Sequence, residues 1–206
     1  WQAIVLFGWF EAHPFPSGLR ETIETIIPTA ASVVASRRAY LETLVAREQA
    51  ERRSVNMEAV AQVSATATTI LDLDELLKTV SYLTKERFGL YHAHIYLLND
   101  EGDRLVLAAG AGEAGDIMKE RRHFIPLNRE HSLVAQSARE RTPIIANDIA
   151  ETPNFLPNPL LPGTRSELAV PMVVANKLVG VLDVQDDHID RFSDEDVRVQ
   201  IALANQ

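Results

Sequence analysis

The stretch from Thr164 to Asp196, TRSELAVPMVVANKLVGVLDVQDDHIDRFSDED, decides the fold. It predicts two β-strands joined by a tight turn at Asn176, because apolar residues alternate before the turn and form a nearly continuous run after it. A polar connector follows, and Ser193 then precedes two acids. A serine followed by acids is typical of a helix N-terminus, where the hydroxyl caps backbone N–H groups and the helix dipole favours negative charge. The stretch therefore predicts a hairpin, a loop and the start of a final helix.

Composition excludes several classes of function. The 206 residues carry a net charge of −9, which disfavours nucleic acids and anionic membrane surfaces as partners. No apolar run reaches the roughly 18 residues of a membrane span. The absence of cysteine removes disulfides, cysteine nucleophiles and thiolate metal sites, and it fits a cytoplasmic location. No metal is predicted, and the sequence identifies no cofactor. The start at Trp1 and the uncapped helical pattern at the other end predict a piece of a longer protein.

Apolar residues at helical spacing predict a long helix over residues 18–70, with a charged segment, AREQAERRS, in its middle. No glycine or proline interrupts that segment, so it is interpreted as a solvated helical linker. A long helix with apolar stripes at both ends commonly pairs with a second copy, which predicts a homodimer through 18–70. The alternative is a helix that packs only on its own domains.

The remaining chain predicts a mixed fold. A helix runs from its N-cap Asp72 to Gly89, and another from Ser132 to Arg141. The segment 110–118 is a loop or a short helix, and the proline-rich segment 147–163 is an ordered loop of a kind that is often functional. The predicted strands, besides the hairpin, are 3–10, 93–98, 105–109, 124–127 and 143–146.

The first residues repeat the pattern of the last ones. AIVLFGWFEAHPF at 3–15 aligns without gaps to GVLDVQDDHIDRF at 180–192, and both segments end in phenylalanine before a capped helix. The match predicts the tail of one domain, a connecting helix and a nearly complete copy of the same domain. Because the match is short and mostly apolar, coincidence is the alternative.

Residues 56–206 resemble a GAF domain through LDLDELLKTV, YHAHIYLLND, NPLLPGTRSELAVPM at 158–172, VGVLDVQ at 179–185 and FSDEDV at 192–197. The resemblance implies an α/β (α+β) fold with a central antiparallel sheet of five or six strands. Helices cover one face and loops cover a pocket on the other. The expected domains are the end of a preceding GAF-like domain at 1–45, a helical linker at 46–55 and the sensor domain at 56–206.

The resemblance also implies a sensory function. Such modules bind a small molecule and relay a signal through a long helix to an output domain, such as a histidine kinase or a cyclase. The alternative is a ligand-free dimerisation module whose pocket is plugged by Phe124, Phe155, Leu160 and Leu161. The family implies regulation and not catalysis, and the related methionine sulfoxide reductases are excluded because they need cysteines. The chain is therefore predicted not to be an enzyme.

Several polar residues are candidates for ligand binding near the expected pocket. Arg165 presents a guanidinium that suits an anion, or else it ties the loop down in an ion pair with Asp148 or Glu167. Ser132 opens a helix whose N–H groups suit an anion, although helix capping is its simpler role. His92 and His94 share one strand face and suit a metal or haem, or are simply polar residues there. Asn176, Lys177 and Phe192 only partly match the signature of cyclic-nucleotide-binding members, because the acidic pair follows Phe192 too closely. The candidate ligand-binding set is His94, Tyr96, Ser132, Asp148, Asn158, Arg165 and Glu167.

Overall fold

The computed structural model describes residues 18–205 except 68, 71 and 154. The chain divides into two compact units, residues 1–54 and 55–206, which are considered separately below. The strand predicted within 3–10, and with it the echo of 180–192, lies outside the described residues. The domain boundaries and the preceding GAF-like segment therefore stay predictions.

Helix α1 spans Leu19–Ala67, so the helix predicted over 18–70 is confirmed to within a few residues. In the first unit its charged segment forms ion pairs between residues four apart, with Arg47 Nε 2.8 Å from Glu51 Oε1 and Arg52 Nη2 3.0 Å from Glu48 Oε1. Exposed pairs at this spacing stabilise a helix by about 0.3–0.5 kcal/mol each. Among the described residues, no helix combines the length and the apolar character that crossing a membrane requires.

The second unit contains a six-stranded antiparallel sheet with the strand order β3-β2-β1-β6-β5-β4. Its strands are β1 His92–Leu98, β2 Arg104–Gly110, β3 Phe124–Pro126, β4 Ile144–Ala146, β5 Ser166–Val174 and β6 Lys177–Asp186. The quoted hairpin is β5 and β6. Its turn residues Ala175 and Asn176 both have positive φ, the geometry whose twist matches that of the flanking strands. The predicted sheet and hairpin are confirmed.

Four further helices complete the second unit: α2 Leu73–Phe88, α3 Gly112–Glu120, α4 Leu133–Glu140 and α5 Asp194–Ala204. The caps read from the sequence are present. Asp72 accepts the Glu75 N–H at 2.9 Å, and Gly89 ends α2 in the left-handed conformation. Ser193 and Asp196 form a reciprocal capping box at the start of α5. The segment after β2 is a helix, which settles the choice left open for 110–118.

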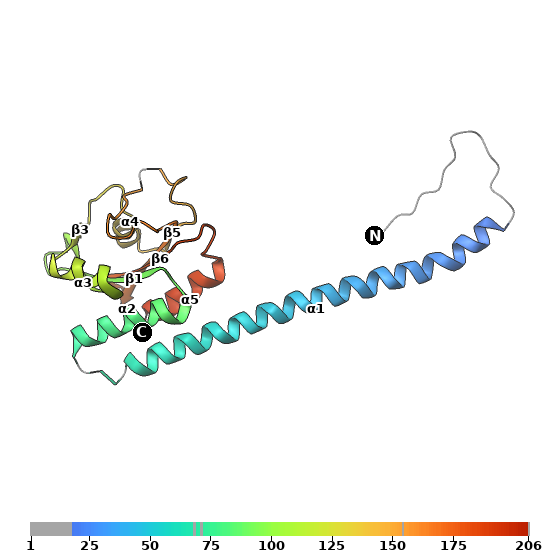
Figure 1. The fold of residues 1–206 in the computed structure, drawn as a ribbon, viewed down its shortest axis with the longest axis horizontal. Helices are drawn as coiled ribbons and strands as arrows, with labels where there is room; N and C mark the ends of the chain where they lie inside the picture. The colour runs from blue at the N-terminus through green and yellow to red at the C-terminus, as the bar shows by residue number, and fades with distance from the viewer. Residues whose placement is uncertain (1–17, 68, 71, 154, 206) are drawn as a thin grey trace. The chain divides into compact units, whose positions relative to one another are not determined.

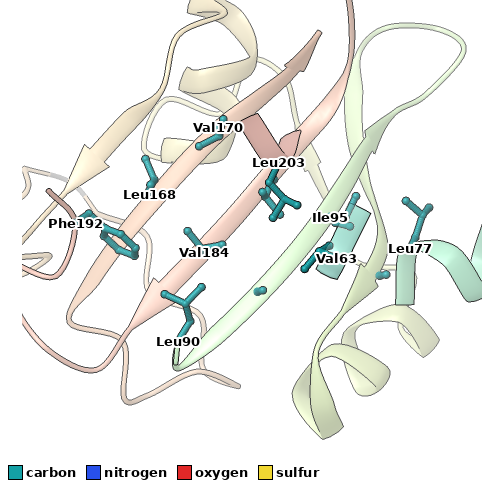
Figure 2. Close-up of a cluster of buried hydrophobic side chains, with 12 residues drawn as sticks. Val63, Leu77, Leu90, Ile95, Leu168, Val170, Val184, Phe192 and Leu203 are labelled. Atoms are coloured by element: carbon teal, nitrogen blue, oxygen red, sulfur yellow. The ribbon is translucent and has the colours of Figure 1, made fainter. Parts of the chain in front are cut away.

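The sheet separates two apolar clusters. Figure 1 shows α2 and α5 on one side of the sheet and α4 on the other. On the helical side, Val63 from the end of α1, Leu77 from α2 and Leu203 from α5 pack on the sheet (Figure 2). The opposite side holds a second cluster that includes Tyr96, Leu133 and Val181. The expected α+β fold with a central antiparallel sheet is confirmed, and the face expected to carry the pocket also carries α4.

Candidate functional site

Strand alternation places a row of polar side chains on the face opposite the helical core. In β6, Leu182 and Val184 belong to the helical cluster, so Asp183 and Gln185 point to the other side. The strand register sets His94 of β1 opposite Asp183, and Glu167 of β5 opposite Gln185. The hairpin of β5 and β6 and the sequence-distant strand β1 thus bring acidic, amide and imidazole groups together.

A pocket of about 400 Å³ lies above this polar row. The sheet forms its floor through Tyr96, Glu167, Asp183 and Gln185, and the start of α4 and the 147–163 loop supply its walls. Of the four residues expected to plug the pocket of a ligand-free module, Phe124, Phe155 and Leu161 lie on the wall of a hollow pocket, and Leu160 packs against the apolar cluster on that side of the sheet. The volume is within the range of small-molecule sites, about 300–1,000 Å³.

Buried hydrogen bonds organise the floor. Thr164 Oγ1 donates to Gln185 Oε1 at 2.7 Å, and Gln185 Nε2 donates to Asp183 Oδ2 at 2.9 Å. His94 Nδ1 donates to the same Asp183 Oδ2 at 3.1 Å. The other oxygen, Asp183 Oδ1, is buried with no hydrogen-bond partner among the described residues. A carboxylate 1% exposed is thus held through one oxygen, and its second oxygen has no donor.

The floor is electrostatically acidic. Burial and the neighbouring Asp183 raise the pKa of Glu167 well above its ordinary value. Burial also raises the pKa of Tyr96, and the carboxylates of Asp183 and Glu167 add to that rise. The phenol therefore stays neutral and serves as a hydrogen-bond donor or acceptor. Such strongly perturbed groups in a concave site are typical of functional positions.

Two buried histidines, His92 and His94, share one face of β1. The rings of His92 and His94 are 4.2 Å apart between centroids. Burial, followed by the nearby His94 and Lys85, lowers the pKa of His92 to about 2, so this ring is neutral. In the described part of the chain, the potential metal-ligating cluster is instead Asp186, Asp187 and His188, which lies mostly at the surface.

The pocket loop is tied to the start of α5. Asn147 Nδ2 donates to the Phe192 carbonyl at 2.9 Å, and the Phe192 N–H donates to Asn147 Oδ1 at 3.0 Å. Arg191 extends the connection, because its Nη2 donates to the Phe88 carbonyl at the end of α2 at 2.9 Å. Its Nη1 also lies 3.3 Å from Asp196 Oδ1 in the first turn of α5. The loop, α2 and α5 therefore meet at residues 191 and 192.

The structure brings most of the predicted site residues to this pocket, although it does not test their role in binding. Tyr96, Ser132, Asn158 and Glu167 line the pocket, and His94 supports the floor through Asp183. Ser132 also caps α4 by accepting the Ala135 N–H at 3.2 Å.

Asp148 and Arg165 are placed elsewhere. Asp148 Oδ1 accepts the Ala150 N–H within the loop, so its carboxylate serves the loop backbone. Arg165 is exposed, and its backbone, not its guanidinium, connects the loop to β6, since its N–H donates to the Asp186 carbonyl at 2.7 Å. The loop contact expected of the Arg165 side chain is thus made by its main chain.

Three residues of the pocket are absent from the set predicted from the sequence: Asp183, Gln185 and Thr164. A signal was present, because Asp183 interrupts the apolar run VGVLDVQ, and a charge in the middle of a buried strand requires a partner or a function. Thr164 carries no comparable signal, since its contact with Gln185 joins residues 21 positions apart.

Solved structures share this fold. A GAF domain of a phosphoenolpyruvate-protein phosphotransferase from Coxiella burnetii matches with a TM-score of 0.64 and 19% identity, over 73% of this chain and 88% of that chain. A putative GAF sensor protein from Burkholderia vietnamiensis matches with a TM-score of 0.62 and 24% identity, over 74% and 90%. A free methionine-R-sulfoxide reductase from Neisseria meningitidis, in complex with its substrate, matches with a TM-score of 0.62 and 24% identity, over 72% and 83%. No curated protein sequence matches the chain significantly.

The reductase structure corrects one prediction. The resemblance implies regulation without catalysis, and so predicts a chain that is not an enzyme. That prediction is contradicted, because structural neighbours of this chain include methionine-R-sulfoxide reductases, which are enzymes. Enzymes and sensor domains share the fold, and the fold alone excludes neither.

The family itself follows from the sequence match together with the fold. A family model described as a GAF domain matches residues 70–206, which is more than half of the chain. The matched range contains the whole sheet, the pocket and both of its walls. The chain belongs to the GAF domain family, a family of signalling and sensory modules.

Proposed function

We propose that residues 56–206 form a cytoplasmic sensor domain that binds a small molecule beneath the 147–163 loop and passes the signal to its terminal helices. One observation carries the proposal: a hollow pocket of about 400 Å³ has a buried polar floor, and its loop is hydrogen-bonded to the start of α5. Apolar walls with a few convergent polar groups are the usual composition of a ligand site.

The route from pocket to helices runs through residues 191 and 192. A ligand that moves the loop pulls on Asn147, and Asn147 holds both backbone groups of Phe192. Phe192 is packed in the helical core, and Arg191 joins α2 to α5. A ligand shifts the helices only if it binds two arrangements of the helices with different affinity. The contacts therefore couple the pocket to the helices, but they do not set whether the ligand switches the output on or off.

The output is proposed to pass through a homodimer built on α1. Ile27, Val34 and Leu41 recur every seven residues, Leu44 follows three residues later, and all four are exposed. This is the spacing of a coiled-coil seam, which a second copy of the helix covers. The signal then reaches an output domain, such as a histidine kinase or a cyclase, in a longer chain.

Ligand screening of the whole 206-residue chain tests the sensor function. The panel contains amino acids, amines, oxo-acids, cyclic nucleotides and tetrapyrroles, measured by thermal shift and then by titration calorimetry. At least one class is expected to raise the melting temperature with one-to-one stoichiometry. If no compound shifts the transition at high excess, the sensor function is overturned.

Sedimentation equilibrium tests the pairing. The wild-type chain is expected to be a dimer, and Leu41→Glu is expected to be a monomer because it places a charge in the seam. Ala39→Glu is the matched control, since residue 39 faces away from the seam and its variant is expected to remain a dimer. A monomeric wild-type chain at micromolar concentration contradicts the homodimer.

A further inference from the structure

We propose that the pocket recognises its ligand through a protonated amino group, which Asp183 and Glu167 hold at the pocket floor. This inference rests on the proposed function, namely that the pocket binds a small molecule. It adds the chemical class of that molecule.

The first support is the orientation of Asp183. Its Oδ2 accepts from both His94 and Gln185, so the carboxylate is fixed in place by the protein. Its Oδ1 is buried, lacks a donor among the described residues and belongs to a residue that lines the pocket. A buried acceptor without a donor is costly, so a donor from a bound molecule relieves that cost.

The second support is a second buried carboxyl that lines the same pocket. Glu167 is 6% exposed, lines the same pocket and lies on β5 opposite Gln185 of β6. Its raised pKa, caused by burial and by Asp183, shows that the two acids are close enough to repel each other. A cation placed between them offsets this repulsion and favours the ionised form of Glu167.

The third support is that the pocket supplies no cation of its own at the floor. Arg129 is the one lysine or arginine among the described lining residues, and its side chain is exposed at the surface. Two histidines also line the pocket: burial followed by the nearby His94 lowers the pKa of His123, which keeps that ring neutral, and His131 is exposed at the surface. Among the described lining residues, no lysine or arginine is buried at the floor, so a bound cation can balance the charge there.

A primary amine suits the floor better than a metal ion. In the described part of the chain, the three ligand atoms that lie within 4.8 Å of one another belong to Asp186, Asp187 and His188, and not to the pocket floor. Two carboxylates and a neutral phenol are instead acceptors for the N–H groups of an ammonium, which carries three donors. The small volume favours a free amine or an amino acid over a peptide.

The test compares amines with the same molecules after the charge is removed. The probes are the twenty common L-amino acids and putrescine, each alongside its N-acetyl derivative, with 2-oxoglutarate, acetate and cyclic AMP as probes that lack a protonated amine. Thermal shift of the whole chain selects binders, and calorimetry measures their affinity. At least one amine is expected to bind, and its N-acetyl derivative is expected to bind at least tenfold more weakly, since a charge-assisted hydrogen bond is lost.

Variants locate the contact. Asp183→Asn and Glu167→Gln are expected to weaken the binding amine at least tenfold, because each keeps the shape and removes the charge. Asp187→Asn is the matched control, since this aspartate is exposed outside the pocket and its variant is expected to bind as the wild type does. If Asp183→Asn does not fold, two measurements still test the amine inference. They are the affinity of Glu167→Gln and the comparison of the amine with its N-acetyl derivative on the wild type.

The outcomes separate the two proposals. If only compounds without an amine bind, or if an amine and its N-acetyl form bind equally, the amine inference is overturned and the sensor function stands. If no probe binds, both are overturned. Equal affinity of the wild type, Asp183→Asn and Glu167→Gln for a bound amine also overturns the inference, because the contact then lies elsewhere.

Discussion

The contact between Asn147 and Phe192 offers the sharpest test of how the pocket loop is joined to the helices. Asn147 is at the start of the loop and Phe192 is directly before the capping residue of α5, and 45 residues separate them in sequence. The change is Asn147→Ala, which removes the side-chain amide and leaves the backbone bond from the Asp190 N–H to the Asn147 carbonyl in place. The variant therefore isolates the two side-chain hydrogen bonds.

The magnitude follows from those two bonds. They join Asn147 to the N–H and the carbonyl of a residue whose side chain is 3% exposed. Each such bond contributes about 0.5–1.5 kcal/mol to stability, so their loss costs about 1–3 kcal/mol. For a chain of this size, 1 kcal/mol lowers the melting temperature by about 2–4 °C, which gives a decrease of about 2–12 °C.

Differential scanning calorimetry measures the shift, and hydrogen exchange of the α5 amides reports where the structure loosens. Asn147→Asp is an intermediate variant, because it keeps the acceptor for the Phe192 N–H and loses the donor to the Phe192 carbonyl. Its decrease in melting temperature is expected to be smaller than that of Asn147→Ala. Asn128→Ala is the control, because Asn128 is exposed. The reasoning is refuted if Asn147→Ala melts at the same temperature as Asn128→Ala, or if exchange in α5 is unchanged.

Three further predictions concern the acidic pocket floor, the helical core and the packing around Gly110 of β2. Because the pKa of Glu167 is raised above its ordinary value of 4.5, the folded protein keeps a proton that the unfolded chain releases, and stability is lost as pH rises above 4.5 toward the folded pKa. The melting temperature of Glu167→Gln is therefore expected to exceed that of the wild type by a difference that grows with pH. A difference that stays constant with pH argues against a raised pKa of Glu167. Val63→Ala is expected to lower the free energy of unfolding in urea by about 2 kcal/mol, since Val63 is 1% exposed. The control Val55→Ala, at a residue that is 62% exposed, is expected to lower it by less than about 0.5 kcal/mol. Equal losses contradict the packing of the end of α1. Gly110→Ala would place a Cβ 2.7 Å from the Cα of Gly115 in α3 and 2.8 Å from the Cδ2 of His94, and it is expected to destabilise the fold by about 1–3 kcal/mol in the same assay. A neutral effect contradicts this close approach of α3 to β2.

Local chemistry allowed much of the fold to be predicted. The caps Asp72 and Ser193, the turn at Asn176 and the alternation in β5 each depend on residues close in sequence, and each is present as expected. The sequence leaves 110–118 open between a loop and a short helix because Gly110, Gly112 and Gly115 lower its helix propensity, while contacts with β2 hold it as α3. Tertiary packing overrode a weak local preference there.

The candidate site was harder to predict, because its groups meet only through strand register and loop placement. His94 and Asp183 are 89 positions apart and come within 3.1 Å because β1 and β6 are neighbours in the sheet. Arg165 has the chemistry of an anion ligand, yet it follows the loop on the exposed side of the chain, and only the structure shows that side.

The sequence by itself determined the secondary structure, the long helix and the resemblance to the family, since these follow from periodicity, caps and turn residues within a few positions of each other. It also contained Asp183 in an apolar strand without showing what that charge faces. Only the tertiary structure decided that the Asp183 and Glu167 carboxyls share one pocket floor and that Asn147 joins the loop to α5. The physical reason is that β5 and β6 pair as a local hairpin, whereas the loop and α4 that enclose its polar face, and the Asn147 contact with Phe192, come from segments distant in sequence that no local preference brings together.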